Sequence, residues 1–436
     1  MKSIKNLRLR YKILFVFIGF LVISNILLYL SYSSLELIIA PHDVDRKVDG
    51  NTLITSATYA EMLYHPTRID QQKQVEDKNP NHKIFEVDKS GKIKWEYYGV
   101  AYPHEVLELP NGHLLVADTG YNRIIEINYP EKDIVWSWEP AKINWTQVNP
   151  KWDEKHYYNS PENKEGEITY DWTHVNDVDY KDYGQWSACL ISIRNFDLVV
   201  EVNYSADLKN PNQANNINWY FGDFGDHDLL YRQHNPDYLK NGNVIIADSA
   251  NNRIIEVNYT TKKVEWEYST GLQWPRDADE LENGDLLITD SFNCRVFELD
   301  KKTKEIKWSY SKDLIIPYEA DKLENGNVLI SSEYNSILLE IDGNQKLVWR
   351  YGLSYIKSTI YLNSFFLIGI SVVCLYLISR PKYYKELKSR KAKKLYGIYG
   401  IFITFLIIAV IMLIFYSEIL ISIARIVYTI VGAEMY

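Results

Sequence analysis

A segment repeated through the middle of this 436-residue chain constrains its fold more than any other feature. Each copy holds four short runs of alternating apolar residues, separated by turn signals such as Asn-Gly. The clearest copies occupy residues 103–138, 233–268, 275–310 and 317–351, and degenerate copies start at Pro41 and at Thr173. A four-strand unit that recurs and ends on Trp is typical of a propeller blade. Six copies therefore predict an all-β, six-bladed β-propeller over residues 33–355.

The two ends of the chain have a different composition from the repeats. Three uncharged apolar stretches have about the ~20 residues that a helix needs to span a membrane, and they cover residues 13–32, 359–379 and 395–416. Residues 1–12 and 380–394 are strongly basic, and basic segments beside membrane helices stay in the cytoplasm. We therefore expect a multi-pass protein of the cell membrane, with a cytoplasmic N-terminus, a cytoplasmic loop at 380–394 and an extracytoplasmic propeller.

Two parts of this topology have alternatives. Residues 13–32 could be a cleaved signal peptide, but the run is long for one and no small-x-small cleavage site follows it. The tail at residues 417–436 is apolar but contains Glu418 and Arg425. It favours an interfacial or packed helix over a fourth span.

Charge and cysteine content exclude several function classes. The net charge of −9 argues against nucleic-acid binding, which needs a basic surface. Three cysteines are too few for a disulfide-framed scaffold or a cysteine-based zinc module. No HExxH-like spacing indicates a catalytic metal, so we expect no metal and no other cofactor.

Aligning the repeats on the glycine of their first turn reveals a column of equivalent residues at the start of the first strand. The position eight residues before Gly50, Gly112, Gly242, Gly284 and Gly326 holds His42, His104, His234, Arg276 and Tyr318, and His174 matches it in the gapped third repeat. The first strand of a blade is the innermost, so these six side chains should meet around the propeller axis. Imidazole and guanidinium groups gathered there would attract an anionic ligand. A histidine-bound metal is the alternative.

The third and fourth repeats resemble the arylsulfotransferase family, whose members move a sulfuryl group between phenols without a nucleotide donor. The likeness lies in His174-Val-Asn176-Asp177, in Ser192-Ile-Arg194-Asn195, in Trp219-Tyr-Phe-Gly222 and in Gln233-His234-Asn235. The resemblance implies that His234 carries the sulfuryl group as a covalent intermediate. It also implies that His174 and Arg194 assist, with His104 as a second helper histidine.

The chemistry of these residue types agrees with that resemblance. The planar fork of an arginine such as Arg194 suits an oxyanion, and a neutral imidazole is a nucleophile near pH 7. His42, Asn176, Arg276 and Tyr318 are then expected to bind substrate. The expected partners are an aryl sulfate donor, a hydroxyl-bearing acceptor and membrane lipid; the anchor suggests an envelope glycan or a lipid-linked acceptor. Two other functions stay open: a surface binding propeller without activity, and a metal-dependent hydrolase.

Overall fold

The computed structural model describes residues 40–57, 82–152, 171–205 and 216–352, together with the single residues 23 and 362. Within these ranges no helix is long and apolar enough to cross a membrane. The predicted spans at 13–32, 359–379 and 395–416 lie outside the described residues, apart from Ile23 and Leu362. So do the basic segments and the tail at 417–436, and the predicted topology stays a prediction.

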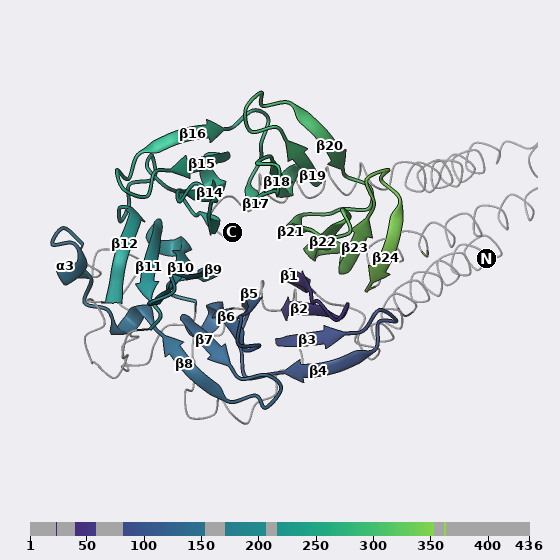
Figure 1. Cartoon of the computed structure of the whole chain (residues 1–436), viewed down its shortest axis with the longest axis horizontal. Coiled ribbons are helices and arrows are strands. Elements are labelled where there is room, and N and C mark those ends of the chain that lie inside the picture. Colours follow the sequence, from purple (N-terminus) through teal and green to yellow (C-terminus); the bar gives the residue numbers. More distant parts are fainter. Residues whose placement is uncertain are drawn as a thin grey trace, which may run out of the picture. The chain divides into compact units, whose positions relative to one another are not determined.

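The repeats form six four-stranded antiparallel sheets among the described residues, arranged as blades around one axis (Figure 1), which confirms the predicted propeller. Blades 1 to 3 comprise β1 (Ala40–Arg46), β2 (Thr52–Ala57), β3 (Lys83–Val87) and β4 (Ile93–Tyr97); β5 (Pro103–Glu108), β6 (Leu114–Asp118), β7 (Arg123–Ile127) and β8 (Ile134–Trp138); β9 (Val175–Asp182), β10 (Ser187–Ile193), β11 (Leu198–Asn203) and β12 (Ile217–Gly222). Blades 4 to 6 comprise β13 (His234–Tyr238), β14 (Val244–Asp248), β15 (Arg253–Val257) and β16 (Val264–Tyr268); β17 (Pro275–Glu280), β18 (Leu286–Asp290), β19 (Arg295–Leu299) and β20 (Ile306–Tyr310); β21 (Pro317–Lys322), β22 (Val328–Ser332), β23 (Ile337–Ile341) and β24 (Leu347–Tyr351).

Short helices occupy the connections between strands. Five of them are single 3-10 turns that join the second and third strand of a blade: η1 (Thr119–Tyr121), η4 (Arg194–Phe196), η6 (Ser249–Asn251), η7 (Ser291–Asn293) and η8 (Glu333–Asn335). The stretch after β8 adds η2 (Pro140–Lys142) and α3 (Trp145–Val148). Each of the five turns starts at the end of a second strand, and its first residue is an element of the site described below.

The core lies between the blades because a four-stranded sheet has two faces to cover. Blades 2 and 3 share the largest apolar cluster, in which Trp138, Trp145 and Trp152 are almost fully buried. The tryptophans of the fourth strands also hydrogen-bond across blade boundaries. Trp95, Trp219 and Trp266 donate through Nε1 to carbonyls of the following blade, at Pro130, Tyr259 and Lys301. These three tryptophans therefore pack between neighbouring blades.

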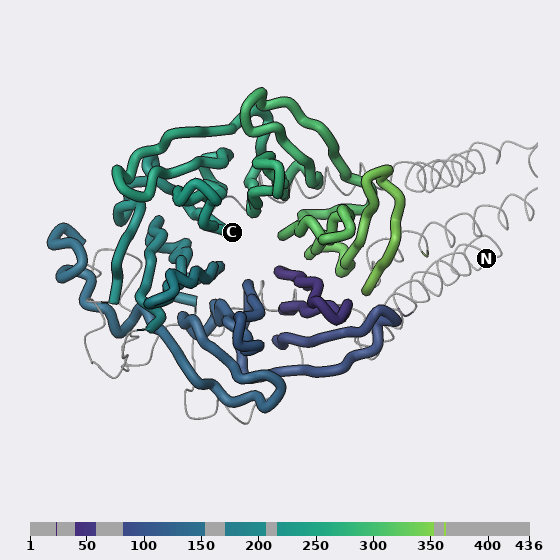
Figure 2. The backbone as a smooth tube through the Cα atoms, in the orientation of Figure 1, coloured from purple at the N-terminus to yellow at the C-terminus, as the bar shows by residue number. Residues whose placement is uncertain are grey.

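The ring closes through side chains, because each blade is built from four consecutive strands and, among the described residues, no strand is exchanged between the first and last blades. Trp349 Nε1 of blade 6 donates to the Lys89 carbonyl of blade 1 at 3.0 Å. Arg46 of blade 1 pairs with Glu340 of blade 6 at 3.0 Å, and its guanidinium lies over the Trp349 ring. Figure 2 shows the first blade, which begins in purple, beside the last blade in green.

Candidate functional site

The first strands bring the six column residues to one buried place on the axis. The His42 and His104 rings stack with their centroids 4.5 Å apart, and His174 meets His104 edge-on at 4.8 Å. The Tyr318 ring lies 4.6 Å from His42 and 6.2 Å from His234, so it bridges the two sides of the group. These are the predicted neighbours, drawn from parts of the chain almost 280 residues apart. We call these six residues the axial cluster.

A tight turn before the first strand places each column side chain. Two residues ahead of the column, Tyr102, Arg232, Trp274 and Ile316 all have φ near +50°. Such a backbone costs a residue other than glycine or asparagine about 1–2 kcal/mol. The same strained turn recurs at four blades, so the fold holds it there to aim the column residue inward.

The backbone and neighbouring side chains fix which imidazole nitrogen carries a proton. Nδ1 of His42 faces the Pro103 carbonyl at 3.2 Å, and Nδ1 of His104 faces the Tyr102 carbonyl at 3.0 Å. A carbonyl only accepts, so in both rings Nδ1 holds the hydrogen and a neutral ring has its lone pair on Nε2. The blade geometry thereby selects a single tautomer.

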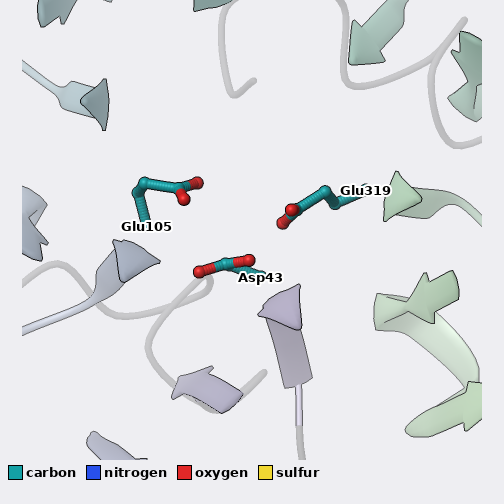
Figure 3. Close-up of side chains that lie close together, drawn as sticks. All are labelled: Asp43, Glu105 and Glu319. Carbon is teal, nitrogen blue, oxygen red and sulfur yellow. The ribbon is translucent and has the colours of Figure 1, made fainter. Parts of the chain in front are cut away.

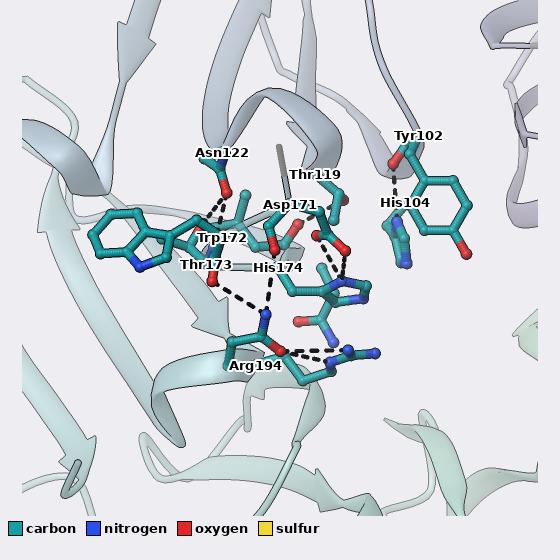
Figure 4. Close-up of polar contacts among 12 residues, drawn as sticks. Tyr102, His104, Thr119, Asn122, Asp171, Trp172, Thr173, His174 and Arg194 are labelled. Atoms are coloured by element: carbon teal, nitrogen blue, oxygen red, sulfur yellow. Dashed lines mark hydrogen bonds and ion pairs between the residues drawn. The ribbon is translucent and has the colours of Figure 1, made fainter. Parts of the chain in front are cut away.

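The other two histidines reach the same state through side chains. Nδ1 of His174 lies 2.8 and 3.0 Å from the carboxylate oxygens of Asp171 (Figure 4). Nδ1 of His234 lies 2.8 Å from Ser249 Oγ, which itself donates to the Pro275 carbonyl at 2.6 Å. Because the serine hydrogen is used there, the serine oxygen accepts from His234. His104, His174 and His234 therefore keep Nε2 for chemistry, whereas Nε2 of His42 faces Glu333 Oε1 at 3.5 Å.

Burial keeps three of these imidazoles, those of His104, His174 and His234, neutral. It lowers the pKa of His104, His174 and His234 well below 6.5, and nearby cationic groups lower each further. For His234 those charges are Arg276 and Arg194, and for His174 Arg194 comes first. A neutral imidazole with a lone pair on Nε2 is the nucleophilic form.

The two arginines of the site differ in how far they are neutralised. Arg276 donates from Nη1 to Glu333 at 3.0 Å and lies over the Tyr318 ring at 4.1 Å. Burial alone would raise the pKa of Glu333, but hydrogen bonding with His42 and the Arg276 charge bring that pKa below its ordinary value. Arg276 thus has a buried counter-charge, and its positive charge is largely balanced.

Arg194 starts η4 and enters the site from the end of the second strand of blade 3. Its guanidinium makes two long contacts, both 3.4 Å, with the amide oxygen of Asn195. Burial lowers the pKa of Arg194 to about 10, so it stays positive at neutral pH. In Figure 4 its guanidinium and the Asp171 carboxylate lie on opposite sides of His174. The arrangement suits an anion that meets Arg194 and the imidazoles together.

Asn176 has a different environment from the one expected of a substrate-binding residue. It is buried, and its Nδ2 donates to the Gln233 carbonyl at 2.9 Å. That bond joins blade 3 to the residue preceding His234, so Asn176 positions the backbone there. Its Oδ1 has no hydrogen-bond partner among the described residues.

The sequence did not indicate three further residues at the site. Tyr102 lies edge-on to His104 at 4.6 Å and 5.1 Å from His42. Asp171 binds His174, and Glu333 joins His42 to Arg276. A signal for Glu333 was available: the position seven residues after the turn glycine holds Thr119, Ser249 and Ser291 in other blades. A carboxylate there breaks the pattern.

A histidine-bound metal has no ligand set in the part of the chain that the structure describes. The one group there with metal-ligand spacing is Asp43, Glu105 and Glu319, which contains no histidine. The stacked and edge-on ring contacts of the axial cluster also differ from rings that point their nitrogens at one ion.

Comparisons with known proteins place one family on this part of the chain. Residues 82–234 match the sequence model of the family described as arylsulfotransferase (ASST). The matched range contains His104, His174, Arg194 and His234 but not His42, Arg276 or Tyr318. None of the curated proteins matches this chain.

Solved structures with a similar fold have low identity to this chain. A protein of unknown function from Bacteroides caccae is 14% identical, with a TM-score of 0.42, over 62% of this chain and 89% of that one. A streptogramin B lyase is 14% identical, with a TM-score of 0.44, over 73% and 84%. A virginiamycin B lyase from Staphylococcus aureus is 11% identical, with a TM-score of 0.43, over 72% and 84%.

Proposed function

We propose that this protein is an aryl-sulfate sulfotransferase that uses His234 as a covalent carrier of the sulfuryl group. The family match over residues 82–234 supports sulfotransferase activity with an aryl sulfate donor and a phenolic acceptor. The observation that carries the covalent step is the hydrogen-bond chain from His234 through Ser249 to the Pro275 carbonyl. This chain puts the proton on Nδ1 and leaves Nε2 as the nucleophilic atom.

In the first half-reaction, Nε2 of His234 attacks the sulfur of the aryl sulfate. An N–S bond forms while the S–O bond to the aryl group breaks, and the aryl oxide leaves with the bonding pair. Negative charge on the three sulfuryl oxygens is met by Arg194, whose guanidinium carries only long contacts within the described residues. The phenols of Tyr102 and Tyr318, whose pKa values burial raises, stay protonated and can donate as well.

In the second half-reaction, the acceptor oxygen attacks the sulfur and the N–S bond breaks. His174 is the base for this step, because Asp171 holds its proton on Nδ1 and Nε2 is vacant. The proton that His174 takes from the acceptor hydroxyl then goes to the next departing aryl oxide. The scheme is a double displacement, and donor and acceptor bind in turn.

The location of the protein belongs to the same proposal and is argued from its sequence. The uncharged stretches at 13–32, 359–379 and 395–416, with basic flanks, support a membrane protein whose propeller faces away from the cytoplasm. An acceptor attached to the envelope, such as a surface glycan or a lipid-linked molecule, would be within reach of a tethered enzyme. This choice of acceptor rests on location alone.

Intact-mass analysis tests the covalent step directly. After exposure to an aryl sulfate without acceptor, the full-length protein should gain about 80 Da, the mass of one SO₃, at His234. His234→Asn should abolish both the adduct and transfer. His113→Asn is the matched control, because His113 pairs with Glu126 away from the axial cluster. An active His234→Asn protein would refute the carrier role, and a wild type inactive with every donor would favour a binding propeller.

A further inference from the structure

The residue after each column position forms a second set of side chains around the axis, and three of its members are carboxylates that meet. Asp43 follows His42 on β1, Glu105 follows His104 on β5, and Glu319 follows Tyr318 on β21. These strands belong to three neighbouring blades, the first, second and sixth. One oxygen from each carboxylate lies within 4.8 Å of the other two. Figure 3 shows the three groups converging, with Asp43 between the two glutamates.

Burial makes this convergence costly while all three groups are ionised. Asp43 is completely buried, and its Oδ2 accepts from the Val106 amide at 2.6 Å. Its Oδ1 has no hydrogen-bond partner among the described residues. Burial raises the pKa of Asp43, Glu105 and Glu319, and for the two glutamates the Asp43 charge is the next cause. A buried carboxylate oxygen that lacks a donor needs either a cation or a proton.

The pseudo-symmetric position in blade 5 separates a structural role from a ligand role. Asp277 also accepts from an amide of the next blade, Ala320, through Oδ2 at 2.9 Å, and it also follows a column residue. Its Oδ2 also accepts from the Thr289 hydroxyl, and its Oδ1, like that of Asp43, has no hydrogen-bond partner among the described residues. Asp277 is not part of the three-carboxylate group. A hydrogen bond between neighbouring blades therefore needs only the aspartate. The two glutamates beside Asp43 are not needed for that role.

We propose that Asp43, Glu105 and Glu319 form a Ca²⁺ site on the propeller axis, distinct from the axial cluster. Carboxylate oxygens are the ligands of hard divalent cations, and Ca²⁺ binds them at about 2.4 Å. Two oxygens on opposite sides of Ca²⁺ are then about 4.8 Å apart, against about 4.2 Å for Mg²⁺ with its shorter bonds. The three oxygens lie within 4.8 Å of one another, so one ion with Ca²⁺–oxygen distances can contact all three. Waters would complete the coordination of the ion.

A cation at this place would hold together the strand starts that carry His42, His104 and Tyr318. Each ligand is the direct neighbour of one of these residues, so binding fixes half of the axial cluster. The site does not take part in sulfuryl transfer, and it stands or falls separately from the proposed function. Its test therefore measures binding and stability.

The test uses the full-length protein after treatment with chelator. We expect calorimetry to show one Ca²⁺ bound per chain, and thermal unfolding to shift upward as Ca²⁺ is added. Glu319→Gln should weaken Ca²⁺ binding at least tenfold, and Glu105→Gln should do the same if the first variant fails to fold. Asp277→Asn, which removes one equivalent buried charge, should change the affinity less than twofold.

Three results would overturn the proposal. In the first, the wild-type protein neither binds Ca²⁺ nor gains thermal stability from it. A shared proton, and not a cation, would then offset the negative charge of the three carboxylates. Binding that survives both glutamine substitutions would place the ion elsewhere. An equal loss of affinity in Asp277→Asn would mean that general negative charge attracts the ion, without a defined ligand set.

Discussion

Replacing Ser249 with alanine tests whether the hydroxyl chain sets the reactive tautomer of His234. Ser249 Oγ accepts from His234 Nδ1 at 2.8 Å and donates to the Pro275 carbonyl at 2.6 Å, with a longer contact of 3.3 Å to the Ala247 carbonyl. Ser291 occupies the same position in the next blade and donates to the Pro317 carbonyl, also at 2.6 Å. No histidine accompanies it, because the column residue of that blade is Arg276. Ser291→Ala is therefore the matched control.

The magnitudes follow from these two bonds. Each variant leaves a buried proline carbonyl without its donor, which costs about 1–3 kcal/mol of unfolding free energy. Only Ser249→Ala also removes an acceptor from His234, a bond worth about 1 kcal/mol. The Arg232 carbonyl also bonds His234 and raises its pKa, so part of the tautomer preference remains. We expect kcat to fall about fivefold in Ser249→Ala, with KM little changed, and to stay within twofold in Ser291→Ala.

Two measurements on each protein separate these effects. Urea unfolding gives the loss of stability, and steady-state kinetics with a chromogenic aryl sulfate gives kcat and KM. Similar stability losses with unequal kcat support the tautomer argument. Equal kcat in the two variants would refute it, because the histidine contact would then contribute nothing to the rate.

Three further outcomes follow from the site. Asp171→Asn replaces a charge-assisted bond to His174 by a neutral one, so kcat in acceptor-dependent turnover should fall about tenfold while adduct formation at His234 continues; loss of the adduct in mass spectra would contradict this. Arg194→Lys keeps the charge but loses the planar fork, so kcat/KM should fall about 10- to 100-fold in steady-state assays, and an unchanged value would remove Arg194 from the oxyanion site. Since the pKa of His234 is lowered, the ring takes up its proton only well below pH 6.5; the acid limb of the kcat/KM profile should lie there, and a limb at or above 6.5 would show that the active histidine is not desolvated.

The sequence predicted the place of each column residue because equivalent positions can be aligned from one repeat to the next. An alignment on the turn glycine identifies the start of every first strand, and blades related by the axis must bring those starts together. Even the gapped third blade obeyed this rule, and His174 lies against His104. Fold and column were therefore predictable from one chain without any relative.

The residues that condition the histidines were harder to predict, since their roles depend on local contacts that no period encodes. Asp171 lies three residues before His174 and has a positive φ, whereas the turns of four other blades have a positive φ two residues before the column residue. The hydrogen bond from His174 to Asp171 therefore has no counterpart that the repeat could reveal. Nothing in the sequence distinguishes Tyr102 from the other tyrosines. Only its strained turn places its ring beside His42 and His104. The hydrogen bond from Asn176 to the Gln233 carbonyl was equally invisible in the sequence, and the expectation that Asn176 binds substrate stays a prediction.

The balance of charge in the axial cluster explains why a sulfate ester suits it better than a more highly charged anion. The carboxylate of Glu333 balances most of the positive charge of Arg276, and the carboxylate of Asp171 is paired with the His174 ring. Arg194 makes only long contacts, at 3.4 Å, within the described residues. Because His104, His174 and His234 are neutral, an incoming group meets arginine charges, chiefly Arg194 with Arg232 near it, and an aryl sulfate brings a single negative charge. A phosphate ester carries close to two at neutral pH, and burying the second without a partner would cost several kcal/mol. Neutral imidazoles therefore serve selectivity as well as nucleophilicity, and both depend on the burial that the six strand starts impose.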